Sequence, residues 1–321
     1  MFRLGAGALV LLSAVLASAC TTGQLQPTMT SLSGATALAQ SKLVEQQRGL
    51  NEAMLAYTTK VALANPGLSA RVESGDCRTS SARCRLWIAV PGGRLPLTGT
   101  SGAEITQLMD GLVGYASDLA AIANAGNGAE LAAATKATSN SIVALTGSID
   151  SFATAAGIST PGLKNLATPL AEPLTQLVNI GLNQYVERRK IEAIRIAVFA
   201  MEPVLEEAVP VFDAIAVQSV EIARLATDDQ FRAARRAYQA SPQSADRLAS
   251  YRRAADLYDV ALQTQPTDVF RKLGAAHAAL ADALRSQRPS FDTVWPILDQ
   301  VLQEAAKLAA AAEQIEKIKN S

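Results

Sequence analysis

The chain has 321 residues, of which 49% are hydrophobic, 18% charged and 5% aromatic. It holds 29 Lys and Arg residues against 29 Asp and Glu residues, so it has no electrostatic reason to bind nucleic acid. One histidine and three cysteines leave little material for a metal site. Abundant Ala and Leu favour helices, because these residues lose little side-chain freedom on entering a helix.

The first residues have the order of a secretory signal. Arg3 gives a basic start, and residues 4–16 form an almost unbroken apolar run that is too short for a permanent membrane span. Three small residues, Ala17-Ser18-Ala19, precede Cys20. An ordinary cleaved signal and a lipid-modified one both begin in this way, and the position of the cysteine favours the second.

This segment resembles the signal of bacterial lipoproteins, although Ala17 stands where that family prefers Leu. The resemblance implies that residues 1–19 are removed and that Cys20 becomes the first residue, carrying acyl chains such as palmitate. It also implies outer-membrane sorting, with the protein facing the periplasm, because Thr21 rather than Asp follows the cysteine.

The mature chain is expected to begin with a flexible tether over residues 20–28, because this stretch is polar and contains Gly23 and Pro27. Residues 29–64 then predict a long helix with a narrow apolar stripe. The stripe recurs every seven residues, at Leu43, Leu50, Tyr57 and Ala64, with Gln47, Met54 and Val61 between them. Asn65-Pro66-Gly67 predicts its end.

Residues 68–99 differ in kind and predict a small β-hairpin, with strands around Arg71–Glu73 and Arg85–Val90. Cys77 and Cys84 lie between these strands, and they form an even pair once Cys20 is assigned to the lipid. In an exported protein such a pair predicts a disulfide. Pro91-Gly92-Gly93 and Pro96 are expected to end the hairpin.

Two matched helices follow. Ser101 with Glu104 forms a capping box, and Ile105, Leu108, Leu112, Tyr115, Leu119 and Ile122 form the apolar face of the first helix. Residues 125–128 predict a glycine turn, after which Asn127 and Glu130 cap a second helix up to about residue 156. Gly111, Gly114, Gly126, Gly128 and Gly147 are interpreted as turn or close-packing positions.

A third long helix is expected from Thr160-Pro161 to about Met201. Pro203 and Pro210 predict bends or breaks, so residues 204–226 and 227–240 are expected to form separate helices. Residues 251–277 resemble a helix pair of the tetratricopeptide repeat, on the spacing of Ala254, Tyr258, Ala261 and Pro266, then of Phe270, Leu273, Gly274 and His277. The resemblance covers too little of the chain for a peptide-binding array, which needs about three units.

The last helix, residues 290–319, has the cleanest apolar seam. Its members are Val294, Leu298, Val301, Ala305, Leu308, Ala312 and Ile315. Because neither this stripe nor that of residues 43–61 can stay exposed, the two ends of the chain are expected to pack into one bundle.

Residues that could carry chemistry have simpler structural explanations. His277 has no metal-binding neighbour in sequence and is interpreted as a packed histidine. The carboxylates Glu202, Glu206 and Glu207, and the basic run of residues 188–190, are typical of solvated helix faces. Phe231, Tyr238, Tyr251 and Tyr258 are interpreted as core or groove wall. No catalytic, metal-binding or cofactor-binding residue is assigned.

The sequence therefore predicts a mainly α protein, an elongated multi-helix bundle with a small disulfide-stapled β-hairpin insertion. The expected divisions are a signal peptide (1–19), a tether (20–28) and a bundle domain (29–321). The expected function is non-enzymatic: a lipid-anchored envelope protein that acts as a helical scaffold or binds another envelope protein, without a cofactor, an identified small-molecule substrate or nucleic acid. The alternative is a membrane-acting protein resembling helical pore-forming toxins, and an enzyme with scattered residues is a third reading.

Overall fold

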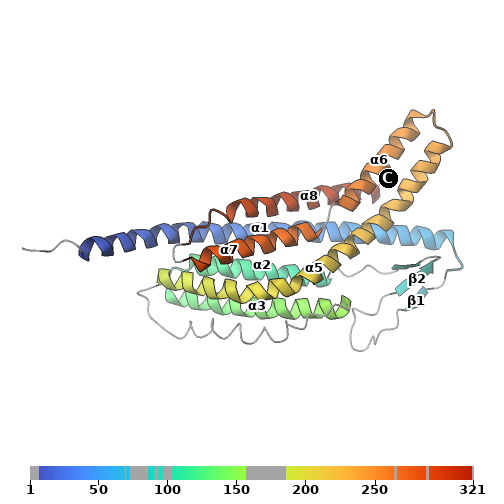
Figure 1. Ribbon diagram of the computed structural model, residues 1–321. Helices are drawn as coiled ribbons and strands as arrows, with labels where there is room; N and C mark the ends of the chain where they lie inside the picture. The colour runs from blue at the N-terminus through green and yellow to red at the C-terminus, as the bar shows by residue number, and fades with distance from the viewer. Residues whose placement is uncertain are drawn as a thin grey trace, which may run out of the picture.

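The computed structural model describes residues 7–68, 70–72, 86–90, 93–96, 103–156, 186–263, 266–286 and 289–319. The fold is mainly helical, as predicted, and the helices form an elongated bundle (Figure 1). Helix α1 runs along its length, and α2, α3, α5, α7 and α8 pack around it or around one another. One large cluster of buried apolar side chains is shared by these helices.

Helix α1 extends from Gly7 to Ala64, so the predicted flexible tether over residues 20–28 is wrong. Leu25 and Met29 are buried, and they continue the apolar stripe of the helix towards its N-terminus. Pro27 lies on the exposed side, where its missing N–H does not interrupt the buried stripe. Packing thus overrides the polar composition of this stretch. The helix ends before Asn65-Pro66-Gly67, as predicted.

Helix α8, Trp295–Lys319, packs along α1 more extensively than any other helix does. The seam residues Leu298, Val301 and Leu308 are all almost fully buried, as are Leu43 and Leu50 of α1. This confirms the prediction that the two stripes pack within one bundle.

Helices α2, Ala103–Asn124, and α3, Gly128–Ala156, form the predicted antiparallel pair. Asn127 caps α3, because its Oδ1 accepts hydrogen bonds of 3.0 Å from the backbone N–H groups of Ala129 and Glu130. Close approach of the two helices depends on Gly111, where an added Cβ would lie 3.0 Å from Cδ1 of Leu145. The interpretation of this glycine as a close-packing position is therefore confirmed.

Helix α5 runs without interruption from Val186 to Gln239, so the predicted division near Pro203 and Pro210 is wrong. Pro210 is exposed, and the buried side chains on either side of it continue one apolar face. These side chains are Met201, Val204, Ala208, Val211 and Phe212. Burial of this face offsets the backbone hydrogen bonds that the prolines remove. Beyond this region α5 leaves the bundle obliquely (Figure 1).

Helix α6, Ala245–Gln263, turns back along the projecting part of α5, and α7, Pro266–Arg285, returns into the bundle. Among the described residues α6 packs on α5 and, less, on α8, whereas α7 packs on α5 and α8. The predicted pairing of these two helices with each other is therefore wrong. The turn predicted at Ser241-Pro242 is present between α5 and α6.

Three short antiparallel strands lie between α1 and α2, at the end of the bundle where α1 stops (Figure 1). β1, Ala70–Val72, pairs with β2, Leu86–Val90, in the register Ala70↔Ile88, and β2 pairs with β3, Gly93–Pro96. The third strand occupies the Gly-Pro segment that the sequence suggested would end the hairpin.

Candidate functional site

A cavity of about 310 Å³ lies between α5 and α7, with parts of α1 and α2 as its floor. Leu32 and Thr36 come from α1, and Leu112 and Tyr115 come from α2. Its walls are mostly aliphatic and aromatic, and Phe212 of α5 stacks on Phe270 of α7 with ring centroids 4.1 Å apart. Val209, 49% exposed, and the exposed Glu206 and Arg271 mark the side that reaches solvent.

A hydrogen bond between two buried side chains lies in the cavity wall. The Tyr115 hydroxyl and Nε2 of His277 are 3.0 Å apart, and both residues are less than 5% exposed. Burial lowers the pKa of His277 to about 4 and raises the pKa of Tyr115 well above its usual value. The pair is therefore neutral at pH 7. His277 is packed, as predicted, but the sequence did not indicate that its ring borders a cavity.

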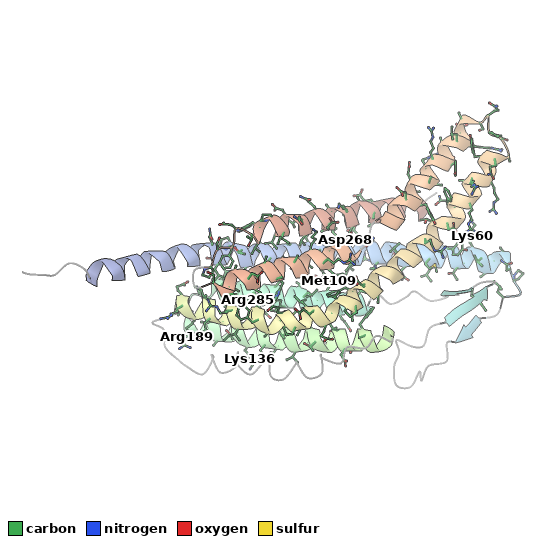
Figure 2. The ribbon with its side chains drawn as sticks, viewed as in Figure 1. Lys60, Met109, Lys136, Arg189, Asp268 and Arg285 are labelled. Atoms are coloured by element: carbon green, nitrogen blue, oxygen red, sulfur yellow. The ribbon has the colours of Figure 1, made fainter. Side chains whose placement is uncertain are left out.

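Carboxylates surround the mouth of the cavity. Glu202 accepts two hydrogen bonds of 2.6 and 2.7 Å from Arg285, which lies at the end of α7 beside α5 (Figure 2). Asp213 pairs with Arg271 at 3.1 Å. Glu206 has no ion-pair partner among the described residues. Of the three glutamates singled out in the sequence, Glu202 and Glu206 line the cavity and Glu207 does not.

A second site is the projecting end of the α5–α6 hairpin, residues 231–253, which we call the hairpin tip. It contains six arginines and a single acidic residue, Asp246. The arginines are all exposed: Arg232, Arg235, Arg236, Arg247, Arg252 and Arg253. Asp228 pairs with Arg232 at 2.9 Å, but Arg235, Arg236 and Arg252 have no acidic partner among the described residues. The tip is strongly cationic on a chain whose overall charge is zero.

Half-buried aromatic rings hold the two sides of this hairpin together. Tyr251 of α6 lies between Phe231 and Tyr238 of α5, with centroid distances of 5.5 and 5.7 Å, and Tyr258 stacks on Phe231. The sequence predicts these rings to be core or groove wall. They pack against one another within the hairpin. The arginines are therefore presented by a hairpin stiffened by ring packing.

The remaining predicted site residues have different outcomes. Cys20 lies within the backbone of α1, and its side chain is not described. Cys77 and Cys84 lie outside the described residues, as do residues 157–185, where the third helix was expected to start.

The basic run of residues 188–190 is not uniformly solvated. Lys190 is buried and pairs with Glu187 at 2.6 Å, whereas Arg188 is exposed.

Within the described ranges, no group of His, Cys, Asp and Glu residues is arranged to hold a metal ion. In the same ranges no helix is both long and apolar enough to cross a membrane. The cavity was missed in the sequence because its residues come from four helices that are far apart in the chain. The charge of the hairpin tip was readable, since six arginines fall within 23 residues.

Comparison with known proteins found no matching family model, no similar curated protein and no similar solved structure.

Proposed function

We propose that this protein is a non-enzymatic envelope lipoprotein, a rigid helical spacer that is anchored to a bacterial membrane through Cys20 and binds an acidic envelope protein at its hairpin tip. The observation that carries the proposal is the position of the tip. It projects from the bundle at the end away from the N-terminus of α1 (Figure 1). Anchor and cationic surface are thus at opposite ends of the molecule.

The geometry of α1 supports the spacer role. Leu25 is already buried in the bundle, and it follows Cys20 by five positions. A lipid on Cys20 would hold the bundle close to the membrane surface. From Leu25 to Ala64 an α-helix spans about 60 Å at 1.5 Å per residue. The hairpin tip and the sheet would therefore face away from the anchoring membrane, where another envelope component can be reached.

The charge of the tip supports an acidic partner. Five of its six arginines are exposed and without an acidic partner among the described residues. Arginine presents a planar fork of donors that matches a carboxylate, and it is enriched in the interfaces of protein complexes. A cluster of like charges also speeds association with an oppositely charged surface.

The anchor is tested by Cys20→Ser, which should abolish labelling with radioactive palmitate and release the protein from the membrane fraction. Unchanged membrane association of this variant would refute the lipoprotein part of the proposal. Dye release from liposomes by the same anchor-free protein would instead favour the membrane-acting alternative.

The tip is tested by photo-crosslinking in cells. A photoreactive amino acid at Arg236 should give a crosslinked complex, and one at Lys136, which is exposed on α3 (Figure 2), should not. Charge reversal by Arg235→Glu with Arg252→Glu should remove the complex and leave the amount of protein unchanged. A crosslink at Arg236 that survives charge reversal would contradict recognition by charge.

We also propose that Cys77 and Cys84 form a disulfide in the loop between β1 and β2. The antiparallel pairing of Val72 with Leu86 brings the two ends of this loop together, which supports a bridge within it. A disulfide that closes so short a loop restricts the unfolded chain, and this loss of entropy would stabilise the folded protein by about 2–3 kcal/mol at 25 °C. Mass spectrometry of unreduced protein from the envelope should find one intramolecular bridge, and two free thiols would refute it.

A further inference from the structure

The cavity between α5 and α7 is separate from the hairpin tip, and nothing in the proposed spacer role uses it. Its volume of about 310 Å³ lies at the lower end of the range of small-molecule sites, about 300–1,000 Å³. Its lining is mainly apolar, with a few polar groups at defined places. Such a combination binds the apolar body of a ligand and orients it through its polar atoms.

One of those polar groups is the imidazole of His277. Its Nε2 is used by Tyr115, but Nδ1 has no hydrogen-bond partner among the described residues. The side chain is 4% exposed, and the ring is part of the cavity wall. A ring nitrogen of histidine without a protein partner can form a hydrogen bond with a ligand. A hydroxyl or carbonyl group inside the cavity would be a suitable partner for it.

The charged residues at the mouth of the cavity determine which ligand charge is favoured. Glu202 and Asp213 are each neutralised by an arginine, at 2.6 and 3.1 Å, whereas Glu206 is unpaired among the described residues. An unpaired carboxylate beside an apolar cavity attracts a cation and repels the head group of a fatty acid.

A glycine lies in the wall of the cavity. Gly274 lines it from α7, and a Cβ built on this residue would meet no atom within 4 Å. Alanine is a better helix former than glycine, so glycine within α7 is not favoured by local helix stability. A larger side chain at this position would extend into the open space without a clash at Cβ.

We infer that this cavity binds a small amphiphilic amine, with its apolar body between α5 and α7, its ammonium group beside Glu206 and a hydroxyl or carbonyl group hydrogen-bonded to His277. The inference does not depend on the spacer role. It requires only the bundle, and loss of the anchor or of the crosslink at the tip would leave it standing.

The test is calorimetric titration of the mature-length chain with Cys20→Ser, which retains every residue described as buried and needs no detergent. The probes are 8-amino-1-octanol, octylamine and sodium octanoate. Amino-octanol should bind at least as tightly as octylamine, and octanoate should bind at least about fivefold more weakly than either. No binding of either amine, or tighter binding of octanoate, would overturn the inference.

Gly274→Leu should abolish amine binding by filling the cavity. Gly147→Leu is the matched control, because Gly147 is also a helical glycine with no atom within 4 Å of an added Cβ, on α3 and away from the cavity. Glu206→Gln should weaken the amines about threefold and leave the binding of 1-octanol, titrated as an uncharged fourth probe, unchanged. If Gly274→Leu does not fold, Ala278→Phe, at an exposed position of the lining, replaces it as the blocking variant. Amine binding that survives a folded blocking variant would place the amines elsewhere and refute the site.

Discussion

The hydroxyl of Tyr115 and Nε2 of His277 lie 3.0 Å apart, although the two residues are separated by 162 positions in the chain. The bond joins α2 to α7 through the interior of the bundle, and it is the point where the buried core meets the cavity. Both groups are neutral at pH 7 because burial disfavours their charged forms.

The burial of His277 predicts that the stability of the protein depends on pH. The pKa of His277 is lowered from 6.5 to about 4 in the folded protein. Between these values the unfolded chain binds a proton that the native protein does not, so the free energy of unfolding should fall as the pH falls from 6.5 to 4. The loss should be about 3 kcal/mol in total. Urea unfolding at several pH values measures it.

His277→Gln serves as the control for this prediction, because an amide keeps a hydrogen bond to Tyr115 but does not titrate. The carboxylates at the cavity mouth, Glu202, Glu206 and Asp213, are the same in both proteins, so their contributions cancel in the difference. Identical pH profiles for the two proteins would show that His277 does not control acid stability.

The seam between α1 and α8 predicts a large effect of Leu308→Ala. Leu308 is 1% exposed, so truncation should leave a cavity and destabilise the protein by about 2–4 kcal/mol. Leu302, on the same helix but 39% exposed, provides the comparison, and Leu302→Ala should change stability by less than about 1 kcal/mol. Chemical denaturation of both variants checks the ranking, and equal effects would contradict the assignment of the seam.

The contact between α2 and α3 predicts opposite effects for two glycine replacements. In Gly111→Ala the new methyl group would lie 3.0 Å from Cδ1 and 3.3 Å from Cα of Leu145, which should cost about 1–3 kcal/mol. In Gly147→Ala the methyl group meets nothing within 4 Å, so the better helix former should stabilise by up to about 1 kcal/mol. Thermal melts should move in opposite directions, and a stabilised Gly111→Ala protein would mean that the helices can separate without loss.

The aromatic packing in the hairpin predicts a local effect of Tyr251→Ala. This ring contacts both Phe231 and Tyr238, so its loss should destabilise the hairpin by about 1–2 kcal/mol. Since α6 packs mainly on α5, the opening should stay local. Hydrogen exchange followed by mass spectrometry should show faster exchange in α6 and no change in α8. Faster exchange throughout the bundle would show that the hairpin is not an independent unit.

The sequence predicted the elements whose signals are local. The apolar spacing of Leu43 and Leu50, the cap at Asn127 and the seam at Leu308 each follow from neighbours within one helix. The errors have a common cause, which is tertiary packing that outweighs a local signal. Pro27 was interpreted as part of a flexible tether and Pro210 as a bend or break, yet each lies on an exposed side while buried neighbours maintain the helix.

The cavity could not be predicted in the same way, because it depends on which helices become neighbours. Gly274 was noted only for a repeat-like spacing and His277 also as a packed histidine. Their place in a cavity wall depends on Tyr115 and Glu206 on other helices. The pairing of α6 with α5 was missed for a similar reason. The aromatic residues that decide it, Phe231 and Tyr251, are 20 positions apart and reach each other only after the turn at Ser241.

The packing of α1 on α8 has a consequence for biosynthesis. A chain emerges with its N-terminal part first, so the part of α1 that packs on α8 must wait for the last helix before it can be covered. During this interval the apolar side chains of α1 that α8 later covers are exposed. Exposed apolar surface of this kind leads to aggregation. Assembly of this bundle thus favours a holding chaperone, and a chain cut short after residue 286 would leave the α8-facing side of α1 uncovered.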